Sequence, residues 1–218
     1  MKLEGLKINF LGDSITEGVG ASSPDTCYVA LMGSRYGAVC RNYGISGTRL
    51  ARQTVPVGEP SFEQDFCGRV EAMDPDADAV VVFGGTNDFG HGDAPLGSFD
   101  DRTQDTFYGA LHTLYSSLMN RFPTAQIVIL TPLHRWNEAD PRGDGFRQTP
   151  TAPLLAYVQA VRQVAEYYSL PVLDLYATSG MQPAVPVSAQ LHFVDGLHPS
   201  DAGHRIIAHK LAQYLKAL

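Results

Sequence analysis

The chain has 218 residues, of which 44% are hydrophobic and 18% charged, and this predicts one globular domain over residues 1–218. Its formal net charge of −7 argues against nucleic acid as a partner, because binding a phosphate backbone needs a basic face. No apolar run approaches the length of a membrane span, and residues 1–5 lack the apolar core of a signal peptide. We therefore expect a cytoplasmic protein, with secretion left open should a signal have been removed.

The first strand is expected over residues 6–11, an apolar run that ends in Gly12-Asp13-Ser14. This turn places the Ser14 hydroxyl at the carboxyl end of a strand, where open α/β sheets bind their ligands. Asp13 is expected to hold the backbone of the turn, with substrate contact as the alternative. A loop over 18–26 then forms the mouth of the site, and a helix is predicted over 28–36, ending at Gly37.

The next two strands are followed by groups that can donate hydrogen bonds to a substrate. A strand over 38–42 leads into Asn42-Tyr43-Gly44-Ile45-Ser46-Gly47, in which a glycine N–H can approach a ligand closely. A helix is predicted to begin at Ser61 and to run to Met73. The continuous apolar run 77–83 predicts a strand buried on both faces, and Gly84-Gly85-Thr86-Asn87-Asp88 follows it. The Asn87 amide is a second donor, and Asp88 is expected to hold the backbone of its own motif.

Two loops in the middle of the chain carry further candidates for contact with a substrate. The loop over 84–101 contains His91, which we interpret as a solvated histidine in preference to a substrate contact. A helix over 103–121 and a strand over 126–131 follow. The irregular stretch 132–149 contains Arg135 and Trp136. We interpret it either as a lid whose side chains shape the acyl or alcohol pocket, or as an ordinary surface loop.

The last third of the chain continues the alternation of helix and strand. A helix is predicted from 154 to 169, a strand over 171–175, a connector over 176–193 and a final helix over 199–218. Such alternation predicts an α/β fold in which a parallel sheet is covered by helices on both sides.

The segment Asp195-Gly196-Leu197-His198 can supply what the Ser14 hydroxyl lacks as a nucleophile. A serine needs a base to take its proton, and the base works best when a third group orients it. Asp195 can reach back to Nδ1 of His198, which leaves Nε2 free to face Ser14. A metal site of Asp195, His198 and Asp201 is the alternative, but no His-x-x-x-His or cysteine pair supports it, so no metal is expected.

Together the four segments resemble the four blocks of the SGNH (GDSL) hydrolase superfamily, in the same order and over residues 12–198. The resemblance implies that Ser14 is the nucleophile, His198 the general base and Asp195 the residue that orients His198. It also implies a three-layer α/β/α, flavodoxin-like fold with about five parallel strands. No cofactor is implied.

The same resemblance implies an oxyanion hole made of three hydrogen-bond donors. They are the backbone N–H groups of Ser14 and Gly47 and the side-chain amide of Asn87. Gly47 is preferred to Gly44, because the glycine of the family motif follows its small residue.

The predicted function is that of a serine esterase acting on a carboxylic ester of a small acylated substrate. The polar loops around the site favour short acyl groups, such as acetyl on a sugar or on another small alcohol. Within the family, a thioesterase, an arylesterase and a lysophospholipase acting on longer chains stay open, as does a non-catalytic member that binds acylated carbohydrate. The oligomeric state is not readable from the sequence, and a homo-oligomer stays open.

Overall fold

The computed structural model describes residues 1–55, 58–145 and 151–218. In these residues five parallel strands form one sheet, in the order β2-β1-β3-β4-β5. The strands are β1 (Lys7–Gly12), β2 (Val39–Gly44), β3 (Ala79–Phe83), β4 (Gln126–Leu130) and β5 (Val172–Leu173). The predicted α/β fold with about five parallel strands is confirmed.

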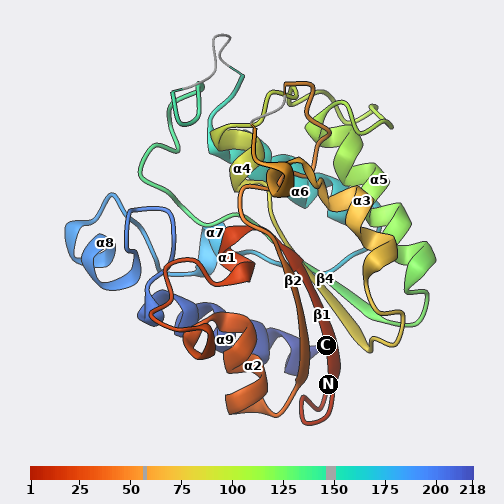
Figure 1. The fold of residues 1–218 in the computed structure, drawn as a ribbon, viewed down its shortest axis with the longest axis vertical. Coiled ribbons are helices and arrows are strands. Elements are labelled where there is room, and N and C mark those ends of the chain that lie inside the picture. Colours follow the sequence, from red (N-terminus) through yellow and green to blue (C-terminus); the bar gives the residue numbers. More distant parts are fainter. Residues whose placement is uncertain (56–57, 146–150) are drawn as a thin grey trace.

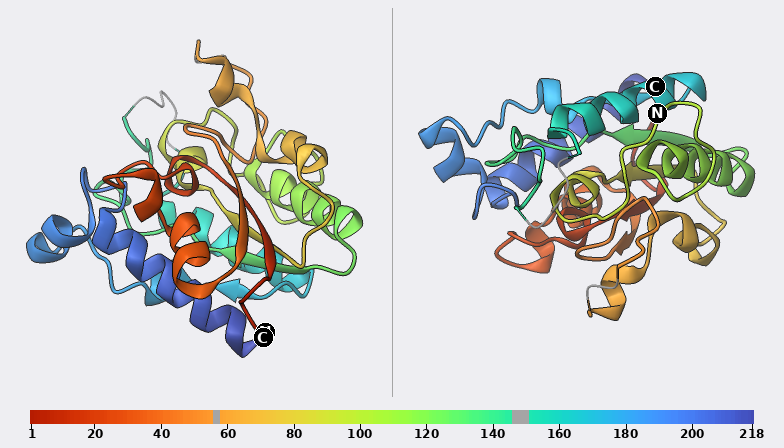
Figure 2. Two further views of the ribbon diagram at one scale, coloured as in Figure 1. Left: turned by 60° about the horizontal axis from the view of Figure 1, so that its bottom comes forward. Right: turned by 90° about the horizontal axis from the view of Figure 1, so that it is seen from above.

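Helices cover both faces of the sheet (Figures 1 and 2). On one face α2 (Tyr28–Tyr36) packs with α9 (Asp201–Ala217), while α3 (Phe66–Arg69), α5 (Phe107–Arg121) and α6 (Leu154–Tyr167) cover the other. Neighbouring residues of a strand point to opposite faces, so Val81 joins the core under α2 and α9 while Val80 and Val82 join the other core. Burial on both faces explains why β3 is apolar at every position.

The long helices are amphipathic, as the sequence predicts. α9 buries Ile207, Leu211 and Leu215 along one side and leaves other positions exposed. α2 has the predicted bounds and ends at Gly37, which adopts a φ of 75° and donates its N–H to the last turn. Across the described residues, no helix combines the length and the apolar character that crossing a membrane requires.

The predicted helix from Ser61 to Met73 is wrong, because the structure divides this stretch into three short elements. They are a 3₁₀ turn (Pro60–Glu63), α3, and a second 3₁₀ turn (Val70–Ala72). The side chain of Asp65 accepts a hydrogen bond from the Gly68 N–H at 2.7 Å and so caps α3 as a new helix. The cap holds Asp65 in an extended conformation, and a continuous helix cannot pass through it.

Other elements differ from the sequence predictions at their bounds. Short helices or turns occupy parts of the expected loops: a 3₁₀ turn (Pro24–Thr26), α4 (Thr86–Gly90), α7 (Leu175–Thr178) and α8 (Pro186–His192). α5 begins at Phe107 rather than at 103, because the Thr106 hydroxyl accepts the Gly109 N–H and caps the helix there. All five residues of α4 are buried, so packing rather than local propensity holds this helix.

The strand order determines where the predicted site segments meet. β1 lies between β2 and β3, and parallel strands present their carboxyl ends at one edge of the sheet. The chain leaving β1 enters α1 (Ser14–Glu17), the chain leaving β2 reaches Gly47, and the chain leaving β3 enters α4 with Asn87. Three segments that are distant in sequence therefore end at the same edge.

Candidate active site

Ser14 is the first residue of α1, and Asp13 alone separates it from the end of β1 at Gly12. The side chain of Asp13 caps α1 by accepting the Ile15 N–H at 3.0 Å. Burial raises the pKa of Asp13 to about 6, and only 2% of this residue is exposed. Gly12 admits no side chain, because a Cβ there would collide with Thr16. The turn therefore fixes Ser14 in a nearly buried position, and Asp13 serves the turn's backbone as expected.

Asp195, His198 and Ser14 form a continuous line of hydrogen-bonding groups. Nε2 of His198 lies 3.0 Å from Oγ of Ser14, and Nδ1 of the same ring lies 2.6 Å from Oδ2 of Asp195. The other carboxylate oxygen of Asp195 accepts the backbone N–H groups of Leu197 and His198 at 2.9 and 2.7 Å. Burial raises the pKa of Asp195, but the hydrogen bonds from His198 and Leu197 outweigh it, so the pKa lies below its usual range. This carboxylate stays ionised and aligned with the ring.

The two glycines of the second segment differ in whether their N–H is available. The Gly44 N–H donates to the side chain of Asn42 at 2.8 Å, whereas the Gly47 N–H has no hydrogen-bond partner among the described residues. Gly47 adopts a φ of 72°, and a Cβ there would lie 2.6 Å from the ring of Phe62. These contacts favour Gly47 over Gly44 as a donor to a ligand.

Asn87 and Asp88 connect the third segment to the second. The Asn87 amide donates to the carbonyl of Thr48 at 3.1 Å, and Asp88 accepts the N–H groups of Leu50 and Ala51 at 3.0 and 2.9 Å. Burial raises the pKa of Asp88 to about 6. Besides the backbone of its own motif, the carboxylate of Asp88 holds the loop after β2, which the sequence does not predict. Sequence spacing gave no signal for this pairing.

His91 and Arg135 belong to a further network that supports the Gly47 loop. Nε2 of His91 lies 3.3 Å from the carbonyl oxygen of Gly47, and its Nδ1 lies 3.7 Å from a carboxylate oxygen of Asp144. Arg135 is 2% exposed, forms a close ion pair with Asp144, and donates to the Thr86 carbonyl at 3.1 Å. His91 is thus bonded rather than freely solvated, and the Arg135 guanidinium is directed into the protein. Sequence reasoning missed Asp144, whose one signal is its place in the same loop as Arg135.

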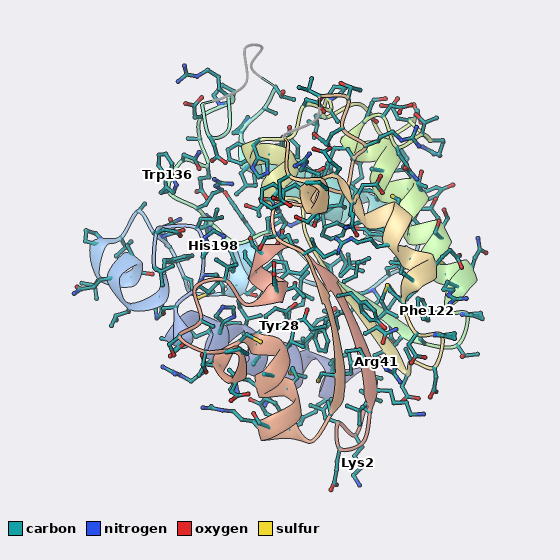
Figure 3. All side chains as sticks on the ribbon, viewed as in Figure 1. Lys2, Tyr28, Arg41, Phe122, Trp136 and His198 are labelled. Atoms are coloured by element: carbon teal, nitrogen blue, oxygen red, sulfur yellow. The ribbon has the colours of Figure 1, made fainter. Side chains whose placement is uncertain are left out.

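Trp136 lies next to the turn that joins Asp195 to His198. Its backbone N–H donates to the Gly196 carbonyl at 3.0 Å, and the residue is 65% exposed. Trp136 and His198 lie on the same flank of the molecule (Figure 3). The expected lid over 132–149 lies partly outside the described residues, since 146–149 are not among them.

The grouping of Asp195, His198 and Asp201 around a metal finds no support in these contacts. Asp201 accepts hydrogen bonds from Ser22 and Thr26, while Asp195 and His198 are bonded to each other. Within the described ranges no cluster of three or more histidine, cysteine, aspartate or glutamate residues could hold a metal ion.

Known proteins share both the sequence pattern and the fold. A GDSL esterase/lipase of Arabidopsis thaliana is 31% identical over 229 residues, covering 96% of this chain and 86% of the relative. A GDSL lipase of Mycobacterium tuberculosis is 26% identical and covers 93% of this chain and 78% of its own length. Among solved structures, a Lactobacillus plantarum protein has a TM-score of 0.85 at 31% identity, covering 98% of both chains. A possible lipase from Chitinophaga pinensis has the same fold, with a TM-score of 0.71 at 23% identity over 97% of this chain and 98% of its own.

The sequence profile of one family accounts for most of the chain. The GDSL-like Lipase/Acylhydrolase family matches residues 10–206, a span that includes all four segments described above. The resemblance inferred from those segments is confirmed. The chain therefore belongs to the GDSL-like lipase/acylhydrolase family.

Proposed function

We propose that this protein is a serine esterase that hydrolyses carboxylic esters through a covalent acyl-enzyme. The observation that carries the proposal is the line from Asp195 through His198 to Ser14, with distances of 2.6 and 3.0 Å. A hydroxyl within reach of an imidazole that is itself oriented by a carboxylate is the arrangement that activates a serine.

In the proposed reaction, Ser14 Oγ attacks the ester carbonyl carbon while Nε2 of His198 takes the hydroxyl proton. Asp195 keeps the other ring nitrogen protonated and stabilises the positive charge that forms on the ring. As the tetrahedral intermediate collapses, the bond to the alcohol oxygen breaks and His198 gives that oxygen its proton. A water molecule then attacks the acyl-enzyme by the same route, which releases the acid and restores Ser14.

The negative charge on the carbonyl oxygen would be held by three donors. The Ser14 N–H lies at the start of α1, the Gly47 N–H has no partner in the described residues, and one Asn87 amide hydrogen remains beside the one given to Thr48. Donors fixed in advance stabilise the transition state without reorganising, so they contribute much of the rate.

For the substrate, we propose a short acyl group, such as acetyl, on a sugar or another small alcohol. The exposed Trp136 beside Gly196 supports this, because a flat aromatic face at the turn that leads to His198 suits a leaving alcohol with a ring. A second candidate is a lysophospholipase or thioesterase that acts on longer chains. It is favoured by exposed apolar residues in the segment that leads to Asp195: Val187 and Leu191 on α8, and Val194, which are 65%, 56% and 58% exposed.

The test is hydrolysis of p-nitrophenyl esters from acetate to decanoate by the wild type, Ser14→Ala and the control Ser116→Ala. Ser116 lies on α5, where its hydroxyl bonds to the helix backbone. We expect activity greatest for acetate, lost in Ser14→Ala and kept in Ser116→Ala. Greatest activity on decanoate would support the second candidate instead. Full activity of Ser14→Ala, or no hydrolysis of any ester by the wild type, would contradict the proposed esterase.

A further inference from the structure

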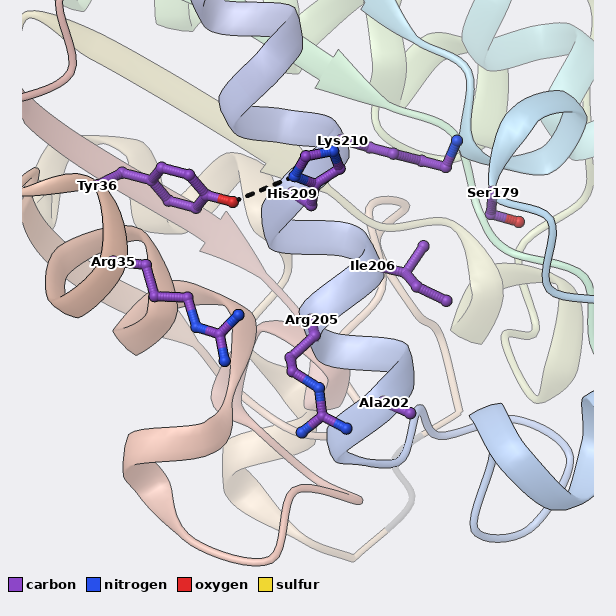
Figure 4. Close-up of a pocket in the computed structure, with 8 residues that line it drawn as sticks. All are labelled: Arg35, Tyr36, Ser179, Ala202, Arg205, Ile206, His209 and Lys210. Carbon is purple, nitrogen blue, oxygen red and sulfur yellow. Dashed lines mark hydrogen bonds between the residues drawn. The ribbon is translucent and has the colours of Figure 1, made fainter.

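A hollow of about 530 Å³ lies across the outer face of α9, apart from the candidate active site. It is lined by Arg35 and Tyr36 from α2, by Arg205, Ile206 and Lys210 from α9, and by Ser179 from the loop after α7. Figure 4 shows the Arg35 and Arg205 side chains extending from the two helices, while Lys210 reaches toward the loop of Ser179. No residue of the proposed catalytic set lines this hollow.

The three positively charged side chains of this hollow, those of Arg35, Arg205 and Lys210, differ from the others described in making no close polar or cation–π contact. The sequence has 16 lysines and arginines, and all except Arg147 are described. Among those described, only Arg35, Arg205 and Lys210 make no hydrogen bond, ion pair within 4 Å or cation–π contact; each of the others makes at least one. All three line the same hollow, in a chain whose net charge is −7.

Asp201 is the acidic residue whose charge interacts with Arg205, but its carboxylate already accepts hydrogen bonds from other residues. Asp201 accepts two hydrogen bonds from Ser22 and one from Thr26, which, with a smaller contribution from the charge of Arg205, hold its pKa at about 2. No aspartate or glutamate is among the lining residues. The Lys216 ammonium does not line the hollow but lies 5.5 Å from the centre of the Tyr36 ring, which does. Unpaired cations that line one hollow repel one another, and an anion bound among them would relieve that repulsion.

We propose that this hollow binds a small organic phosphate. Arginine guanidinium groups match the geometry of phosphate oxygens and bind them through paired hydrogen bonds, so Arg35 and Arg205 would hold the phosphoryl group. The Tyr36 ring and the Ile206 side chain offer apolar contact for the organic part, and Lys210 adds a third positive charge across α9. This binding function is independent of ester hydrolysis at Ser14.

The test is calorimetric titration with phenyl phosphate and with inorganic phosphate, at low ionic strength because salt screens exposed charges. The variants are Arg35→Gln/Arg205→Gln and a control, Lys2→Gln/Arg52→Gln, which removes two charges from residues that are 80% and 60% exposed elsewhere. We expect one phenyl phosphate per chain, at least tenfold weaker binding in the Arg35/Arg205 double variant, and a change of less than twofold in the control. Lys210→Gln should also weaken binding, and Ser14→Ala should bind as the wild type does.

Several results would overturn the proposal. Equal weakening in both double variants would mean that net charge alone attracts the anion. Equal affinity for inorganic and phenyl phosphate would mean that Tyr36 and Ile206 do not contact the organic part of the ligand. Loss of binding in Ser14→Ala would place the anion in the active site. An absence of binding by the wild type at millimolar phenyl phosphate would contradict the site altogether. Circular dichroism of each variant confirms that it is folded.

Discussion

We propose two tasks for the Asn87 side chain, a structural hydrogen bond and the donation of a second one to the oxyanion. One amide hydrogen is donated to the Thr48 carbonyl at 3.1 Å, which leaves the other for a developing oxyanion. We predict that Asn87→Ala lowers kcat by about a hundredfold to a thousandfold with little change in KM, as removal of an oxyanion donor does. Steady-state kinetics on p-nitrophenyl acetate measures both constants. A rise in KM with kcat unchanged would mean that Asn87 only binds the substrate.

Gly47 is constrained both by its backbone and by its neighbour. Its φ of 72° disfavours any side chain, and a Cβ would lie 2.6 Å from the Phe62 ring. We predict that Gly47→Ala reduces kcat at least tenfold and destabilises the protein by more than the roughly 1–2 kcal/mol that backbone strain alone costs. The matched control is Gly5→Ala, where φ is 77° but no atom lies within 4 Å of the added Cβ. Urea unfolding and kinetics of both variants test this, and equal effects in the two would contradict the role given to Phe62.

At the residue scale, the sequence predicts those parts of the site that lie within short motifs. Asp195 and His198 are three residues apart, so one turn of chain decides their contact. Asp88 and Asp144 could not be assigned in this way, because their partners are set by tertiary packing. Asp88 reaches back across the sheet edge to Leu50 and Ala51, and Asp144 joins His91 to Arg135. Nothing local in the sequence records such pairings.

At the scale of elements, helix caps decide the bounds. The Thr106 hydroxyl accepts the Gly109 N–H at 3.1 Å and donates to Asp101 at 2.9 Å. We predict that Thr106→Ala lowers the free energy of unfolding by about 1 kcal/mol, because the first turn of α5 loses its cap. Thr113→Ala, in the middle of the same helix, is the control and should change stability by less than half as much, since its hydroxyl only bonds back to Gly109. Urea denaturation gives both values, and equal losses would show that the cap is not the cause.

Competition between local helix propensity and tertiary contacts explains which elements the sequence predicts well. α2 ends at a glycine in the left-handed conformation, which is a local signal, and its predicted bounds are correct. The stretch from Ser61 to Met73 has helical spacing, but Asp65 caps a separate helix and Arg69 donates to the carbonyls of Gly12 and Tyr43. These tertiary contacts interrupt the helix that the local pattern favours. Local propensity is decisive only where no such partner competes with it.

At the scale of the whole molecule, the order of the strands brings the separate site segments to one edge of the sheet, which no single motif in the sequence predicts. Alternation of strands and helices predicts the parallel sheet, but it does not say which strands are neighbours. In the structure β1 lies at the centre of the order β2-β1-β3, so Ser14 has a donor segment on each side. The segment of Asp195 and His198 reaches the same edge from the far end of the chain, where a bridge between Phe193 and Pro199 closes its loop. The site therefore depends on the complete fold.

A buried carboxyl at this edge also links the stability of the molecule to pH. Burial raises the pKa of Asp88 from its ordinary 3.8 to about 6, so between pH 4 and 6 the folded protein keeps a proton that the unfolded chain has lost. The contribution of Asp88 to the free energy of unfolding therefore falls as the pH rises through this window. Asparagine does not titrate, so we predict that the stability of the wild type relative to Asp88→Asn falls from pH 4 to pH 6 and is constant above that range.

The slope of this difference reports chiefly Asp88, because the other groups titrate in both proteins. The substitution also lowers the pKa of Asp13, which burial and, to a smaller extent, the charge of Asp88 raise to about 6. The histidines whose pKa burial lowers, His112 and His204, act in the opposite direction on each protein alone and cancel in the comparison. One proton corresponds to a slope of up to about 1.4 kcal/mol per pH unit. Urea unfolding of both proteins at half-unit steps from pH 4 to 7.5 measures it. A difference that stays constant or rises between pH 4 and 6 would show that Asp88 is ionised in the folded protein throughout this range, held by the N–H groups of Leu50 and Ala51.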